Sequence, residues 1–229
     1  FVQKEEKSMD RPRGNQQKPK PKEIATATSH WNPKVTPDRH VLESFTLEEK
    51  QTKSLRNLGF TTAHVVPSAG IFRGQSALIH LGDWSPSSII KEAGPAQSIG
   101  YEYGSWSDPA YPNSLLGAVA LIRQTFYDAQ WYDAAWKVYK RYPQNNDQPE
   151  EDRALTALNI HLKNNNAFLF ETGEELAALR AGKIAEEFDL NLWLKGNGYE
   201  YRRLEDIKEL KSFIILPLNF PKKPDVATW

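Results

Sequence analysis

Residues 167–218 read AFLFETGEELAALRAGKIAEEFDLNLWLKGNGYEYRRLEDIKELKSFIILPL, and this stretch decides the fold. Short apolar runs at 167–170, 191–194 and 213–218 alternate with helical segments at 174–188 and 204–210. The run Phe213-Ile214-Ile215-Leu216 is continuous, which is typical of a strand buried on both faces of a parallel sheet. The alternation predicts an α/β architecture built from strand and helix units.

The chain before this stretch follows the same pattern less clearly. We expect strands at 61–66, 76–81 and 97–103, and helices from Pro112 through Trp136 and over 152–162. A capping box at 46–49 predicts the start of order and of a first helix, which Gly59 is placed to end. A closed barrel needs eight strands and typically about 250 residues, and about six strands are expected here. The sequence therefore predicts an incomplete TIM-like (β/α) barrel.

Three regions are expected along the chain. Residues 1–45 are predicted to be a polar, basic connector, extended or disordered, because 4–22 has almost no apolar residue to bury. A solvated linker is favoured over a nucleic-acid-binding segment, since no aromatic residue lies among the charges between Val2 and Ile24. Residues 46–224 form the expected partial barrel, and 225–229 a tail.

Composition excludes several kinds of protein. The 29 basic and 29 acidic residues cancel, so no overall field favours nucleic acid or an anionic membrane. The chain has no cysteine, which excludes thiol nucleophiles, disulfides and zinc sites that need a thiolate. No stretch has the length and apolarity of a membrane span, and the first residues have no signal-peptide core. We therefore expect no nucleic-acid partner and no membrane span.

The candidate site residues are those expected near the carboxyl ends of strands, where barrels carry their sites. They are His64, Arg73, Glu171, Lys195 and Glu200, all taken as substrate-binding. For His64 the alternative is a hydrogen-bonded interior histidine, and this alternative is favoured. For Arg73, in the run Gly70-Ile71-Phe72-Arg73-Gly74, a structured turn is favoured over an anion-binding loop, because the pattern is not that of a P-loop. Lys195 and Glu200 flank a glycine-rich turn, and a solvated charge pair explains them equally well.

No catalytic residue and no metal ligand is assigned. None of the five histidines stands in a His-x-His or His-x-x-x-His pair, so a metal site would need convergent strand ends. His80 is expected to be structural, and His161 is expected on a helix surface. Ser76 lacks the second glycine and the following helix of a nucleophile elbow. A helically spaced aromatic set is expected to pack against another part of the protein: Tyr127, Trp131, Tyr132, Trp136 and Tyr139.

Two stretches resemble a known family. Asn57-Leu58-Gly59-Phe60-Thr61-Thr62-Ala63-His64-Val65-Val66-Pro67 and the run from Gly70 to Leu78 resemble the amidohydrolase superfamily, especially its imidazolonepropionase-like bacterial members. Further similar segments, in long two-part proteins of that kind, are Tyr111-Pro112-Asn113-Ser114, the run 121–125, Leu179-Arg180-Ala181 and the run 215–221. The resemblance extends from about Trp31 to Pro224.

The resemblance implies a metal-dependent barrel that hydrolyses C–N bonds of cyclic amides, amidines or peptides through metal-activated water. The family's first His-x-His is missing from this chain, and Phe170-Glu171 and Lys195-Gly196 stand where later histidines are expected. We therefore expect this segment to bind no metal and to be inactive alone, while an active parent protein would hold zinc or another divalent metal.

Two readings of the parent protein remain open. In the first, this chain is a segment of an active amidohydrolase-like protein. In the second, it is a non-catalytic degenerate barrel module with a structural or interaction role. The expected partner in both is the remainder of the same polypeptide, a second amidohydrolase-like barrel. The resemblance also suggests a periplasmic or secreted location.

Overall fold

A computed structural model describes residues 29–46, 48–82, 90–105 and 111–218. Within these ranges the strands form one six-stranded sheet in the order β1-β2-β3-β4-β5-β6. The strands are β1 (Thr62–Val65), β2 (Phe72–His80), β3 (Ile90–Gly100), β4 (Ala167–Glu171), β5 (Asn191–Lys195) and β6 (Phe213–Ile215). The helices are η1 (Val41–Glu43), α1 (Glu49–Asn57), α3 (Leu115–Arg141), α4 (Arg153–Lys163), α5 (Glu175–Phe188), η2 (Glu200–Arg203) and α6 (Leu204–Glu209). The α/β class is confirmed.

The sheet is mixed. Strands β3 to β6 are parallel. Helices α3 and α4 lie between β3 and β4, α5 between β4 and β5, and η2 and α6 between β5 and β6. Strands β1, β2 and β3 pair antiparallel. The first three strands thus depart from the alternation of a (β/α) barrel, and no helix separates them in the described chain.

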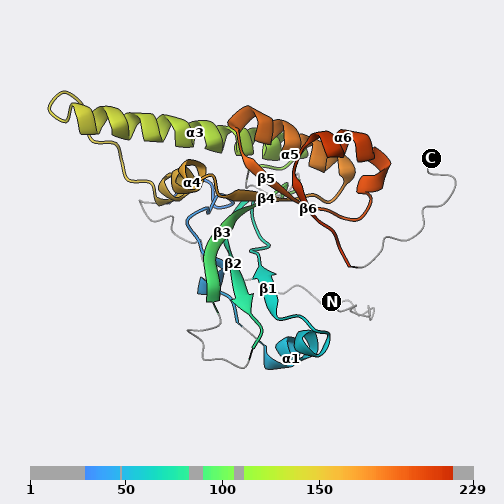
Figure 1. The fold of residues 1–229 in the computed structure, drawn as a ribbon. Helices are drawn as coiled ribbons and strands as arrows, with labels where there is room; N and C mark the ends of the chain where they lie inside the picture. The colour runs from blue at the N-terminus through green and yellow to red at the C-terminus, as the bar shows by residue number, and fades with distance from the viewer. Residues whose placement is uncertain (1–28, 47, 83–89, 106–110, 219–229) are drawn as a thin grey trace, which may run out of the picture.

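The strand pattern separates two faces of the sheet. In β4, Phe168 and Phe170 belong to the main core, whereas Ala167 and Leu169 belong to a smaller cluster on the opposite face. The main core is completed by the helices, through side chains such as Phe126 of α3. Figure 1 shows α3, α5 and α6 gathered on one side of β4–β6, while β1, β2 and α1 extend away from them. We call the helix-covered face the outer face.

The other face, the inner face, is concave. The rings of His64 in β1 and Trp193 in β5 meet edge to face with centroids 6.3 Å apart. Neighbouring strands are spaced about 4.8 Å apart, so strands in these two positions of a flat sheet would lie roughly 19 Å apart. Contact between the two rings therefore requires the sheet to curl. The expected incomplete TIM-like barrel is confirmed as a six-stranded half-barrel.

The structure corrects two predictions, the start of the first helix and the start of the ordered chain. The capping box at 46–49 does not form: α1 begins at Glu49 after Glu48, whose side chain makes no capping hydrogen bond. Order also begins before Thr46, since Val35 is buried in the main core and Val41 in a second cluster. The first part of the expected connector, 1–28, and the tail lie outside the described residues.

The last strand is the largest departure from prediction. The run 213–216 was expected to be buried on both faces, but its side chains are exposed. Phe213 is 70% exposed, Leu216 61% and Leu218 82%. Strand β6 pairs with β5 on one side and has no strand partner on the other within the described residues. An apolar strand thus forms an open edge of the half-barrel.

Candidate functional site

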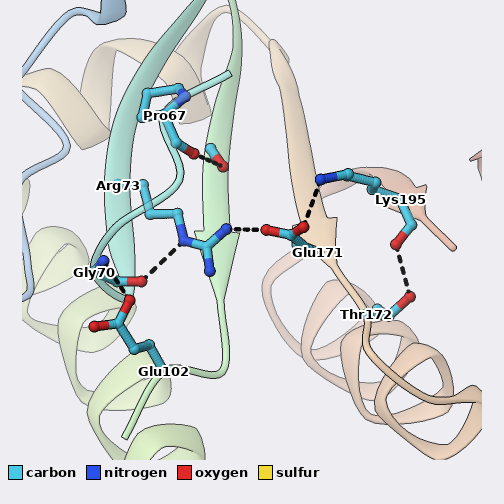
Figure 2. Close-up of polar contacts among 8 residues, drawn as sticks. Pro67, Gly70, Arg73, Glu102, Glu171, Thr172 and Lys195 are labelled. Carbon is cyan, nitrogen blue, oxygen red and sulfur yellow. Dashed lines mark hydrogen bonds and ion pairs between the residues drawn. The ribbon is translucent and has the colours of Figure 1, made fainter. Parts of the chain in front are cut away.

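The carboxyl ends of β3, β4 and β5 lie together because these strands are parallel and in register. Strand β2 runs antiparallel to β3, so its first residues reach the same end of the sheet. Arg73 of β2, Glu171 of β4 and Lys195 of β5 therefore converge, as Figure 2 shows. Three of the five candidate residues predicted from the sequence form one ion network at the mouth of the half-barrel.

Arg73 is held from two sides. Its Nη1 donates to Glu171 Oε2, and its Nε donates to the carbonyl oxygen of Gly70 at 3.0 Å. The side chain is 9% exposed. Gly100 at the end of β3 makes room for it, because a Cβ on Gly100 would collide with the guanidinium group. The turn at Gly70 is tied down in its own right, since its N–H donates to Glu102 at 2.7 Å.

Glu171 accepts from two cations. Lys195 Nζ donates to Glu171 Oε1 at 2.5 Å, opposite the contact with Arg73. Burial alone would raise the pKa of Glu171, but the hydrogen bonds from Lys195 and Arg73 outweigh it and hold the pKa below its ordinary value. Glu171 therefore stays ionised near neutral pH and is not a general acid.

A second set of bonds fixes the turns after β4 and β5. The backbone N–H and the hydroxyl of Thr172 both donate to the carbonyl oxygen of Lys195, each at 3.0 Å. Asn197 Nδ2 donates to the carbonyl oxygen of Gly173 at 2.7 Å. The backbone that carries the network is thus held by bonds that do not involve its charged groups.

A pocket of about 450 Å³ opens beside the network. It lies between the ends of β3 and β4 and the starts of α3 and α5. Its lining is Arg73, Tyr101, Glu102, Tyr103, Leu115, Glu171, Gly173, Glu174, Ala177 and Arg180. Arg73 and Glu171 belong to both the network and the pocket, so the ion network forms one wall of a cavity able to hold a small molecule.

The remaining two predicted residues lie elsewhere. His64 is on the inner face, where its Nε2 lies 2.8 Å from Ser76 Oγ. The favoured prediction of an interior, hydrogen-bonded histidine fits this position. Glu200 is buried and accepts from the backbone N–H groups of Asn197 and Gly198 at 2.6 and 2.8 Å. Glu200 therefore shapes the turn after β5 and does not line the pocket.

His161 was predicted to be a surface residue, and this prediction is wrong. It is 3% exposed, and its ring meets Phe168 edge to face. Burial lowers its pKa. The single-sequence pattern could not distinguish the inward from the outward face at this point of a short helix.

Eight of the ten residues that line the pocket were not named by the site prediction, among them Tyr101 and Arg180. Tyr101 directly follows β3, and Arg180 lies on the helix that follows β4. The position of Tyr101 at a strand end was the available signal for it. Arg180 had no such signal, because it reaches the mouth only through the packing of α5.

The described residues do not fit a metal ion. They contain no group of three or more His, Cys, Asp or Glu side chains placed to hold one. The carboxylate at the strand ends, Glu171, is already bonded to two positive groups, which oppose binding of a divalent cation.

Among the described residues, no helix is long and apolar enough to cross a membrane.

No model of a known protein family matches the chain, and no curated protein matches it. The fold is similar to the crystal structure of an amidohydrolase from Thermotoga maritima MSB8, with a TM-score of 0.67 and 21% sequence identity. The match covers 84% of this chain and 52% of the Thermotoga chain. The chain spans about half the length of that structure and has the fold of part of an amidohydrolase-type barrel.

Proposed function

We propose that this chain is one part of a larger amidohydrolase-like barrel and supplies a wall of its mouth. In this proposal the rest of the polypeptide supplies the metal ligands. The whole protein would then hydrolyse a C–N bond of a cyclic amide, amidine or peptide-like substrate through metal-activated water. The run 57–78 favours an imidazolonepropionase-like member of that group.

The observation that carries the proposal is the open edge at β6. Phe213, Leu216 and Leu218 expose large apolar side chains on or next to a strand that has no partner on its outer side among the described residues. A strand of this kind associates with other chains unless it is covered. In the Thermotoga amidohydrolase, about half of the chain lies beyond the matched part. The rest of the barrel is the occupant that such an edge suits.

A second function is favoured by the ion network. Glu171 and Lys195 occupy the ends of two strands with a salt bridge, an arrangement that stabilises the mouth without a metal. The alternative is therefore a non-catalytic barrel module that serves as a structural or interaction domain. The two proposals share the edge and differ in hydrolysis.

The test uses the complete polypeptide that contains this chain. Leu216→Lys should lower its melting temperature, because a covered apolar edge would then carry a buried charge. Leu116→Lys is the matched control, since Leu116 is 79% exposed on α3. Equal melting temperatures for the two variants would refute the covered edge.

Hydrolysis is assayed on the same preparation loaded with zinc, with a cyclic amide and a dipeptide as substrates. Turnover that chelation abolishes supports the enzyme. A covered edge without turnover supports the non-catalytic module.

A further inference from the structure

Tyr101, which lines the pocket beside the ion network, has a hydroxyl group that no group among the described residues satisfies. Tyr101 Oη is buried, and it has no hydrogen-bonding partner among the described residues. The Tyr101 ring packs beside Phe170, so the side chain is fixed by the core. An unsatisfied buried hydroxyl is unfavourable unless water or a ligand bonds to it. Burial also raises the pKa of Tyr101, and the hydroxyl keeps its proton near neutral pH.

Arg180 provides a positive group in the same pocket. Its Nη1 donates to Glu174 Oε1 at 2.8 Å. Glu174 is the residue before α5, and its side chain makes no capping hydrogen bond to the helix. The Glu174 side chain is 54% exposed and that of Arg180 is 35% exposed, so this ion pair can exchange with a competing anion.

We propose that this pocket binds the carboxylate of a small ligand through Tyr101 and Arg180, and that Glu174 is an internal carboxylate that competes for Arg180. The start of α5 also lines the pocket, through Glu174 and Ala177, and the positive end of the helix dipole favours a negative charge there. The proposal stands on the fixed hydroxyl, the arginine and the cavity they share.

The other residues that line the pocket indicate the chemistry of the rest of the ligand. Leu115 and Ala177 are apolar, and Tyr103 contributes an aromatic ring. Glu102 and Glu171 also line the pocket, and their charges disfavour a second anionic group on the ligand. The pocket of about 450 Å³ therefore suits a monocarboxylate with a compact apolar or aromatic body.

The inference rests on the proposed function only in taking the mouth as a ligand-binding surface. It needs neither a metal nor turnover. The probes are 3-phenylpropionate and its neutral amide, 3-phenylpropionamide, which have the same body and differ in charge. Binding is measured by ligand-observed NMR titration of the complete polypeptide, without added metal.

We expect the acid to bind at least about ten-fold more tightly than the amide, because the acid accepts charge-assisted bonds. Tyr101→Phe and Arg180→Gln should each weaken binding of the acid by about ten-fold. Glu174→Gln should strengthen binding of the acid several-fold and leave the amide unchanged.

The matched controls are Tyr127→Phe and Arg123→Gln. These residues form an equivalent tyrosine and arginine pair on Glu187, outside the pocket. Both controls should leave binding of the acid unchanged. The inference is overturned if acid and amide bind equally or not at all, if Arg180→Gln behaves like Arg123→Gln, or if Glu174→Gln weakens the acid. The covered edge and hydrolysis are scored in separate assays, so either proposal can fail while the other holds.

Discussion

Replacing Glu171 by Gln tests whether the ion network stabilises the mouth. The substitution keeps the size of the side chain and removes the charge shared by Arg73 and Lys195. The Arg73 side chain, 9% exposed, then loses its anionic partner in a largely buried position and keeps its bond to the carbonyl oxygen of Gly70.

The magnitude follows from burial. Removing one partner of a fully buried ion pair costs about 3–5 kcal/mol. Glu171 is 36% exposed and Lys195 is 49% exposed, so water screens part of the network. We therefore expect Glu171→Gln to lower the free energy of unfolding by about 2 kcal/mol at neutral pH. For a domain of this size that corresponds to a fall in melting temperature of roughly 4–8 °C.

The pH dependence of stability provides an independent test of the ion network. The pKa of Glu171 is lower in the folded state than in the unfolded chain. Its contribution is therefore complete above the unfolded pKa and is lost as the pH falls through the folded pKa. The stability difference between wild type and Glu171→Gln should shrink as the pH is lowered from 7 towards 3.

The assay is urea denaturation followed by circular dichroism across this pH range. Glu187→Gln is the control, because its partner Arg123 is 49% exposed whereas Arg73 is 9% exposed, so losing the charge of Glu187 should matter less. The reasoning is refuted if Glu171→Gln is as stable as wild type at pH 7. A stability gap that stays constant down to pH 3 would refute it equally.

Two further predictions concern the core. Phe126 is fully buried, and its ring contacts those of Phe72, Phe168 and Phe188. Phe126→Ala should therefore lower the free energy of unfolding, measured by urea denaturation, by about 3–5 kcal/mol. Leu116→Ala on the exposed face of α3 is the control and should change it by less than about 0.5 kcal/mol. Burial lowers the pKa of His161, so its contribution is present above the unfolded pKa and is lost as the pH falls below it. His161→Phe should therefore lose less stability than wild type between pH 7.5 and 5, and an equal loss would contradict this account.

The elements of the fold could be predicted where a local pattern determines them. Each expected strand and helix has a counterpart, and Gly59 ends α1 in a left-handed conformation as predicted. The antiparallel pairing of β1 and β2 could not be read from the chain, because runs such as Phe72–His80 do not reveal the direction of their neighbours. The exposure of Phe213 was missed for a related reason: a continuous apolar run indicates that a strand is meant to be covered and says nothing of what covers it.

The convergence of the candidate residues was predictable in part. Glu171 and Lys195 lie at the carboxyl ends of parallel strands, which meet at one edge of the sheet. Arg73 reaches the same edge for another reason, because it lies at the start of the antiparallel strand β2. Arg180 was missed because it comes from the side of a helix, where its direction depends on how α5 packs. The capping box at Thr46 failed because a local signal competes with the tertiary contacts that bury Val41 and order the chain earlier.

The two kinds of pairing around β3 have a consequence for the order of folding. Its contacts with β2 join residues close in the sequence, whereas Ala96 meets Ala167 across an intervening segment of about seventy residues that includes α3 and α4. Closing that long loop costs entropy before any contact repays it, so high-contact-order pairs form slowly. We expect the β1–β2–β3 meander to gain protection from hydrogen exchange first during refolding. Strand β3 would then be the template on which the parallel half of the sheet assembles.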